Sequence, residues 1–308
     1  MNAGPLSASS GDPTVDRRVE WARALMGEGN AADAAEMLDE VTRRVPDYLP
    51  GWFLLGEARE KAGEKIPAAD AYARALALDV QDRYGAGVRL ARLGHGAEGM
   101  SAAYVRILFD QYAERFDDAL GKLGYRGPEL VHGALQMACA ALGRPFAFAH
   151  GIDLGCGTGL VGVRLADHVG TMDGVDLSPN MIALARRRGI YGELAAADML
   201  DFLHARGSEE VDLIFAGDAF CYLQELGPIL AESRRVLEPQ GLLAFTVETH
   251  DGADILLRDT LRYAHAESYV REALAAAGLE TLSCVDAWTR KEKDIPVPGL
   301  VVVAMRGA

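Results

Sequence analysis

The chain has 308 residues, of which 50% are hydrophobic, and a formal charge of −14 at pH 7. This length favours two domains, each able to bury a core. An acidic surface repels phosphate backbones and anionic lipids, and no run of about 18 apolar residues occurs, so we expect neither nucleic acid nor membrane as a partner. The four cysteines are scattered without metal-ligand spacing, which predicts no disulfide framework, no metal site and a reducing, cytoplasmic location.

The N-terminal third contains an internal repeat. Residues 1–13 are rich in Ser, Gly, Pro and Ala, without the features of a signal peptide, and we expect them to be a disordered tail. Within residues 14–97, the positions of Ala34, Leu38 and Val41 recur 34 residues later. This period resembles the tetratricopeptide repeat, a helix–turn–helix unit. An ordinary bundle of alanine-rich helical hairpins is the alternative.

Glycine density rises over residues 94–99, which marks a domain boundary. Residues 98–145 are expected to form a linker and helices. Leu108, Tyr112 and Phe116 recur on one helical face and predict an amphipathic helix that packs its aromatic side chains against a core.

Strand and helix signals alternate from residue 146 to residue 308, which predicts an α/β fold with a doubly wound, Rossmann-like parallel sheet. Strands are expected at 151–154, 172–175, 194–197, 211–216 and 242–247, and helices at 160–167, 179–187, 226–237 and 269–277. The last two strands, 281–285 and 300–305, are joined by a short connection and must be antiparallel. We therefore expect seven strands that end in a reversed hairpin.

A glycine-rich turn, Gly155-Cys156-Gly157-Thr158-Gly159, follows the first of these strands and predicts a nucleoside cofactor site. Glycine permits positive φ and close approach of the backbone to a ligand. The run from Gly157 to Gly162 also fits the dinucleotide pattern G-x-G-x-x-G, so an NAD-dependent oxidoreductase is an alternative. Asp153 precedes the turn, where a carboxylate suits a cationic α-ammonium group and would repel a pyrophosphate.

Two further carboxylates, Asp176 and Asp198, end the next two strands. The carboxyl ends of parallel strands meet at one edge of a sheet, so all three acids should converge on one crevice. Asp176 can accept hydrogen bonds from both ribose hydroxyls, and Asp198 can accept one from an adenine amine. The side chains that could sandwich the purine are Leu177, Met181 and Met199.

This set of motifs resembles the class I S-adenosylmethionine-dependent methyltransferases. Residues 153–159 are similar to the first motif of that family and residues 175–181 to its second. Residues 235–243 are similar to the turn that enters its fifth strand, with Gln240 in place of a glycine. The resemblance implies S-adenosyl-L-methionine as the cofactor, held by Asp153 and the glycines at the methionine end, Asp176 at the ribose, and Asp198 with Met199 at the adenine.

With the repeat and the stretch Phe109–Ala113, the whole chain looks like bacterial methyltransferases that carry an N-terminal tetratricopeptide-repeat region. In related enzymes a helix before the first strand covers the cofactor. The resemblance therefore makes Tyr112 and Phe116 candidate lid residues and adds Gly217, after the fourth strand, to the cofactor site. The helical region implies a possible protein partner.

Methyl transfer from a sulfonium depends mainly on positioning and on exclusion of water. If a base is needed, His250 and His265 are the catalytic candidates. The turn after the fourth strand lacks the Asn/Asp-Pro-Pro-Tyr pattern of base and glutamine methylation, and a small polar or anionic acceptor is expected instead. A protein-directed methyltransferase and a non-catalytic adaptor are the alternatives. The candidate acceptor residues are Asp218, Phe220, Tyr222, Arg262, Tyr263 and Arg290.

Overall fold

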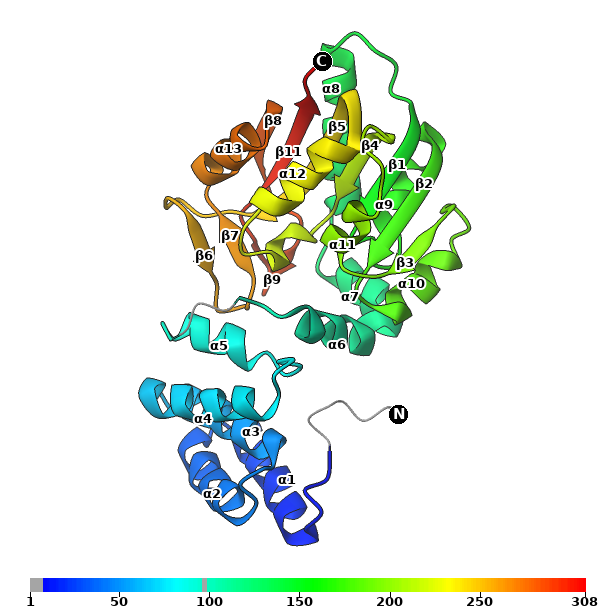
Figure 1. The fold of residues 1–308 in the computed structure, drawn as a ribbon. Helices are drawn as coiled ribbons and strands as arrows, with labels where there is room; N and C mark the ends of the chain where they lie inside the picture. Colours follow the sequence, from blue (N-terminus) through cyan, green and yellow to red (C-terminus); the bar gives the residue numbers. More distant parts are fainter. Residues whose placement is uncertain (1–7, 96–98) are drawn as a thin grey trace. The chain divides into compact units, whose positions relative to one another are not determined.

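The computed structural model describes residues 8–95 and 99–308. It divides the chain into two units, the first ending at Tyr104 and the second running from Val105 to Ala308. The first unit is helical and the second combines helices with a central sheet (Figure 1). The boundary expected at residue 97 lies outside the described residues. No helix in the described part of the chain is long and apolar enough to cross a bilayer.

The first unit is built from helices that pack each against the next in the sequence. They are α1 (Pro13–Gly27), α2 (Ala31–Arg44), α3 (Leu49–Lys61), α4 (Lys65–Leu78) and α5 (Ala86–Arg92). Helices α2 and α4 both begin and end 34 residues apart. The equivalent pairs of the sequence repeat, Ala34 and Ala68, Leu38 and Tyr72, and Val41 and Ala75, are all fully buried.

Residues 8–12 form a cap for helix α1, so the predicted disordered tail extends too far. The Asp12 side chain accepts hydrogen bonds from the backbone N–H groups of Thr14 and Val15, and Pro13 occupies the first helical position. The Ser10 hydroxyl donates to Asp16, over 2.6 Å. An acidic cap followed by proline is a strong helix start, which the sequence analysis overlooked. Residues 1–7 of the expected tail lie outside the described residues.

The second unit surrounds a mixed sheet (Figure 1). Its helices are α6 (Ala102–Tyr112, which starts in the first unit), η2 (Ala113–Arg115), α7 (Phe116–Lys122), α8 (Gly127–Ala141), α9 (Leu160–Leu165), η3 (Ala166–His168), α10 (Pro179–Arg186), α11 (Met199–His204), η4 (Phe220–Tyr222), α12 (Gly227–Val236) and α13 (Glu267–Ala276). Its strands are β1 (Phe148–Leu154), β2 (Val169–Asp176), β3 (Leu194–Ala196), β4 (Val211–Ala216), β5 (Leu237–Glu248), β6 (Ile255–Leu257), β7 (Tyr263–His265), β8 (Leu279–Ala287), β9 (Lys291–Glu292), β10 (Ile295–Pro296) and β11 (Gly299–Arg306).

The main path of the sheet runs β3-β2-β1-β4-β5-β11-β8. The first five of these strands are parallel, whereas β11 is antiparallel to both β5 and β8. The predicted doubly wound sheet with a reversed terminal hairpin is thus confirmed. Strands β6 and β7 extend it beyond the seven expected, because β7 pairs with the end of β5. Such short strands carry too few residues to show a period of two.

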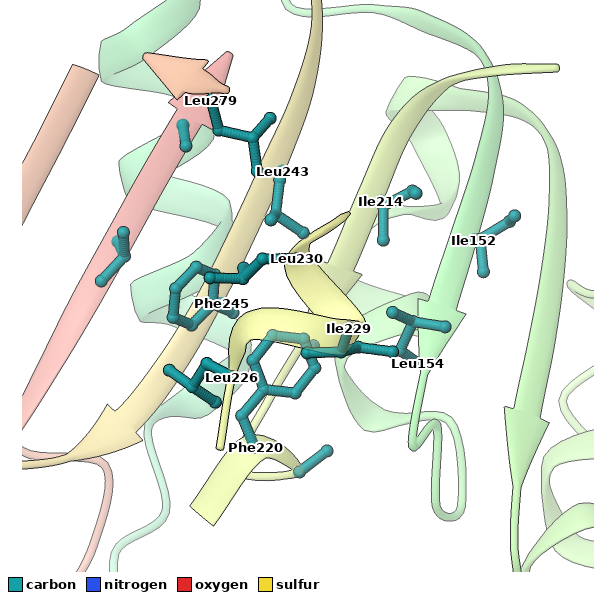
Figure 2. Close-up of a cluster of buried hydrophobic side chains, with 14 of the residues drawn as sticks. Ile152, Leu154, Ile214, Phe220, Leu226, Ile229, Leu230, Leu243, Phe245 and Leu279 are labelled. Carbon is teal, nitrogen blue, oxygen red and sulfur yellow. The ribbon is translucent and has the colours of Figure 1, made fainter. Parts of the chain in front are cut away.

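Apolar side chains cover both faces of the sheet, as expected for parallel strands packed between helices. On one face, Ile152 and Ile214 lie near Ile229 and Leu230 of helix α12 (Figure 2). Phe220 belongs to this cluster and is fully buried, its ring centre 5.0 Å from that of Phe245. Its predicted role in contacting an acceptor is therefore wrong.

Strand order reverses between β1 and β4, because β2 and β3 lie on one side of β1 and β5 lies beyond β4. In sheets of this type, ligands bind beyond the carboxyl ends of the strands at the point of reversal. The glycine turn follows β1 directly, so the topology places it at that point.

Candidate cofactor and acceptor site

The glycine turn adopts a backbone that only glycine takes easily. Gly155, Gly157 and Gly159 have φ values of 68°, 54° and 88°. A Cβ on Gly155 would lie 2.5 Å from the Cβ of Ala219, so the turn packs tightly against the segment that follows β4. The turn is also anchored to the neighbouring strand, because the Cys156 N–H donates to the Val175 carbonyl over 2.9 Å.

Asp176, the last residue of β2, fixes the shape of this turn. Its carboxylate accepts hydrogen bonds from the backbone N–H groups of Gly157, over 2.9 Å, and Ser178, over 2.8 Å. One side chain thereby joins the segment after β1 to the segment after β2. The expected convergence of Asp176 with the glycine turn is present.

Asp153 is enclosed by protein groups. It is 1% exposed, and its carboxylate accepts hydrogen bonds from the Tyr191 hydroxyl, over 2.7 Å, and from the Gly162 N–H. A Cβ on Gly162 would collide with the same Tyr191 hydroxyl. Gly162 is therefore explained by packing, without a pyrophosphate, and Asp153 can act on a ligand chiefly through its charge.

Both acids carry raised pKa values. Burial raises the pKa of Asp153 to about 7, with a contribution from Asp176, against the hydrogen bond from Tyr191. Burial also raises the pKa of Asp176 to about 6, although the N–H groups of Ser178 and Gly157 oppose the change. Desolvation penalises the charged form, so a cation in the crevice would stabilise both carboxylates.

The remaining cofactor candidates divide into two groups. Asp198 caps helix α11, and its carboxylate accepts hydrogen bonds from the backbone N–H groups of Leu200 and Asp201. Asp198, Met199 and Leu177 are all partly exposed and follow the ends of strands at the crevice. By contrast, Met181 is fully buried, and the Cys156 side chain packs in a core cluster. Met181 and the Cys156 thiol therefore pack in the core next to the site and do not line its surface.

Helices α6 and α7 are fastened to the same crevice by two carboxylates. Asp110 accepts hydrogen bonds from the Ser178 hydroxyl, over 2.5 Å, and from the Asn180 N–H. Asp117 accepts from the Thr158 hydroxyl, over 2.5 Å, and pairs with Arg188. The Thr158 side chain thus binds this helical segment. Its residues 105–122, which belong to the second unit, are called the lid below.

The lid presents aromatic rings to the crevice. Phe116 lies over the turn, 3.7 Å from where a Cβ on Gly157 would be. Phe109 contacts both Phe116 and Tyr222 in edge-to-face arrangements, with ring centres 5.9 and 5.2 Å apart. Tyr112, the other predicted lid residue, is 51% exposed. Phe109 therefore takes the place that the sequence analysis gave to Tyr112.

A buried ionic cluster lies beyond the ends of β4 and β5. The Arg290 guanidinium, 2% exposed, donates to Asp218 over 3.0 Å, to Glu292 over 3.1 Å and to Glu248. Asp218 also accepts from the hydroxyls of Thr246 and Thr289. Asp218 and Arg290 are thus occupied by each other, which speaks against direct binding of an acceptor by either.

Arg262 and Tyr222 border this cluster. Arg262 donates through Nε to the Tyr222 hydroxyl, over 3.0 Å, and through Nη1 to Glu292, over 3.1 Å. Both side chains are partly exposed, whereas Tyr263 is 3% exposed. Tyr222, with Phe109 against its ring, therefore offers a more accessible surface to an acceptor than Tyr263 does.

Neither candidate histidine is well placed as a general base. His265 is fully buried, and its Nε2 lies 3.1 Å from the carbonyls of Leu223 and Gln224, so this nitrogen is a donor. Burial lowers its pKa to about 4. His250 uses Nδ1 to accept from the Gly252 N–H. The geometry fits structural roles for both.

Several residues of the site escaped the sequence analysis. They are Phe109, Asp110, Asp117, Tyr191 and Glu248. Asp110 and Asp117 are seven residues apart, and each directly follows one of the aromatic residues Phe109 and Phe116, a recurrence that could have identified them. Glu248 and Tyr191 meet their partners across long sequence separations, for which the sequence carries no local signal.

Comparison with known proteins agrees with this geometry. Residues 152–245 match the family model described as a methyltransferase domain. A dTDP-3-amino-3,6-dideoxy-alpha-D-glucopyranose N,N-dimethyltransferase of Streptomyces fradiae is 42% identical over 65 residues, which are 21% of this chain and 26% of that protein. A malonyl-[acyl-carrier protein] O-methyltransferase of Enterobacter lignolyticus is 32% identical over 134 residues, 42% of this chain and 53% of that protein. The chain thus spans about half or less of these relatives.

Solved structures share the fold. The 1,6-didemethyltoxoflavin-N1-methyltransferase of Burkholderia thailandensis, solved with bound S-adenosylhomocysteine, aligns with a TM-score of 0.51 and 21% identity, covering 67% of this chain and 89% of that one. A putative methyltransferase in complex with the Trm112 activator of Haloferax volcanii gives a TM-score of 0.52 and 20% identity, covering 66% and 98%.

We predict that replacing Asp153 with Asn stabilises the ligand-free protein at pH 8 and does so less than half as much at pH 5. Because the folded-state pKa is raised to about 7, the folded protein holds this proton more tightly than the unfolded chain. The resulting stability is full below about pH 4 and is lost as the pH rises through about 7. Asn cannot ionise, so Asp153→Asn should gain up to about 4 kcal/mol at pH 8. Calorimetric melts at both pH values test this, and an equal effect at both would contradict it.

We predict that Asp117→Ala loosens the lid. The substitution removes the acceptor for Thr158 and Arg188, and hydrogen bonds to charged groups contribute about 1.5–3 kcal/mol. Amide hydrogen exchange of residues 113–122 should accelerate about tenfold. The adjacent Asp118→Ala is the matched control, because Asp118 is exposed. Equal exchange in the two variants would show that Asp117 does not fasten the lid.

Proposed function

We propose that this chain, whose residues 152–245 match a methyltransferase-domain model, is a class I S-adenosylmethionine-dependent methyltransferase that transfers a methyl group to a small-molecule acceptor. The observation that carries the proposal is the hydrogen bond from the Gly157 N–H to the Asp176 carboxylate, next to the buried Asp153. This arrangement gives a carboxylate at the end of β2 and a negative potential around the turn.

The charge of the methyl donor suits this crevice. S-adenosylmethionine has a sulfonium, an ammonium and one carboxylate, and thus one net positive charge. Bound there, it would stabilise the ionised forms of Asp153 and Asp176, whose pKa values are raised by burial. A dinucleotide would bring a pyrophosphate to the same place and be repelled. Together with the packing role of Gly162, this disfavours an NAD-dependent oxidoreductase.

Individual residues would hold different parts of the donor. Asp176 would accept from the ribose hydroxyls and Asp198 from the adenine amine, while Leu177 and Met199 would contact the purine. When bound, the donor supplies an electrophilic methyl group on its sulfonium. Phe116 over the turn would exclude water from this group, a contribution that in-line transfer requires.

We further propose that the acceptor is a small molecule with an apolar or aromatic portion. Phe109 and Tyr222 form the aromatic surface beside the crevice, and the arginines there are already balanced by Glu248, Asp218 and Glu292. An anionic acceptor would have to rely on the partly exposed Arg262. The relatives named for a sugar nucleotide and for an acyl carrier protein support a metabolic acceptor without selecting one. Because neither histidine offers a free nitrogen toward solvent, a dedicated base is not part of this proposal.

For the first unit we propose tetratricopeptide-type repeats that recruit a protein partner. The 34-residue offset between α2 and α4 supports this proposal, as does the burial of equivalent positions in both. Gly56 supports it too, because a Cβ there would lie 2.5 Å from the Tyr72 ring, the close helix contact that such repeats require.

We predict that the purified protein binds S-adenosylhomocysteine saturably at sub-millimolar concentrations, and that Asp176→Asn weakens this binding at least tenfold at pH 8. The amide cannot accept two charge-assisted hydrogen bonds from a ribose, each of which contributes about 1 kcal/mol or more. Asp201→Asn is the matched control, since Asp201 is exposed in the first turn of α11.

Isothermal titration calorimetry measures both effects. Absence of saturable binding in the wild-type protein would overturn the proposed function. Binding that Asp176→Asn leaves unchanged would instead place the ligand away from the end of β2.

A further inference from the structure

A tyrosine hydroxyl lies beside the segment that follows β4. Tyr125 belongs to the connection between α7 and α8, and a Cβ on Gly217 would lie 3.1 Å from its hydroxyl oxygen. Gly217 follows β4 directly. The electrostatic partners of the hydroxyl include Asp218, after β4, and Asp153, in β1. The hydroxyl therefore lies at the point where strand order reverses.

The loop that carries Tyr125 is held firmly in place. The Arg126 N–H donates to the Thr289 carbonyl over 2.7 Å, and the Lys291 N–H donates to the Leu123 carbonyl over 2.9 Å. The Arg126 guanidinium also lies 4.5 Å from the centre of the Trp288 ring. The partners of the loop lie in residues 288–291, which also contain Arg290, and Arg290 pairs with Asp218. Tyr125 is thus positioned by the same framework that fixes the segment after β4.

The Tyr125 hydroxyl has hydrogen-bonding capacity to spare. Within residues 8–95 and 99–308 it makes no hydrogen bond, although its pKa is raised well above the ordinary value by burial and by Asp218 and Asp153. The group therefore stays protonated and neutral, able both to donate and to accept. The charged groups that act on it are Asp218, Asp153 and Arg290, and the two carboxylates outweigh the guanidinium, which favours a positively charged ligand group.

The order of the strands in the sheet indicates where each part of the methyl donor would bind. Asp198 follows β3, Asp176 ends β2, the glycine turn follows β1, and Gly217 follows β4. With adenine at β3 and ribose at β2, the amino-acid end must extend over β1 toward β4. This direction leads from the ribose to the Tyr125 hydroxyl.

We propose that the Tyr125 hydroxyl accepts a hydrogen bond from the α-ammonium group of the methyl donor. The assignment rests on the proposed function and identifies a cofactor-binding residue from outside the strand-end motifs. The ammonium is favoured over the α-carboxylate because Asp218 and Asp153 act on the hydroxyl more strongly than Arg290 does. Asp153, closed off by Tyr191 and Gly162, supplies charge there without contact.

The test compares wild type and Tyr125→Phe by calorimetry with three ligands. S-adenosylhomocysteine has the whole amino-acid end, its decarboxylated analogue keeps the ammonium alone, and 5′-methylthioadenosine lacks both groups. Tyr125→Phe should weaken binding of the first two about tenfold or more, as expected for one lost hydrogen bond to a charged group, and change the third less than twofold. Tyr112→Phe, on the exposed side of the lid, should change none.

Each contrary result has a distinct meaning. If wild type binds none of the three ligands, the proposed function fails, and this inference fails with it. If wild type binds S-adenosylhomocysteine and Tyr125→Phe binds it equally well, only the inference fails. Equal weakening of all three ligands would make Tyr125 a structural residue, and unchanged binding of the decarboxylated analogue would overturn the assignment to the ammonium.

Discussion

The carboxylate of Asp176 is the interaction on which the site depends. By accepting from the N–H groups of both Gly157 and Ser178, it joins the turn after β1 to the segment after β2. The lid is fastened to the same two segments, through Thr158 and Ser178. A change at this carboxylate would therefore disturb the cofactor crevice and its cover together, which couples the shape of the site to one partly buried carboxylate.

Burial of that charge has an electrostatic consequence. Burial raises the pKa values of Asp153 and Asp176 by penalising their charged forms. A donor with net positive charge would relieve this unfavourable state, whereas the acceptor side is already neutralised by arginines. The two halves of the crevice thus differ: the donor half holds two carboxylates that no basic side chain neutralises through an ion pair in the described residues, and the acceptor half pairs its charges and offers mainly aromatic surface.

Local patterns in the sequence were sufficient for the sheet, its reversed hairpin, the glycine turn and the acids at strand ends. Glycine spacing and strand periodicity are local, and parallel topology brings strand ends together. Side-chain roles that depend on distant partners could not be predicted in this way. From the sequence alone, Arg290 is typical of a solvated residue in a hairpin. In the fold, its guanidinium binds Asp218, after β4, and Glu248, at the end of β5. Likewise, Tyr112 and Phe109 share one helix, and only packing against Tyr222 determines which ring faces the crevice.

A crystal structure of the full chain with S-adenosylhomocysteine tests the central claim most directly. The account predicts the ribose hydroxyls within hydrogen-bond distance of the Asp176 carboxylate, the adenine beside Asp198, and the amino-acid end over the glycine turn toward Gly217. It also predicts that Phe116 covers the ligand. Ligand density elsewhere in the molecule, or a ribose that does not contact Asp176, would contradict the account.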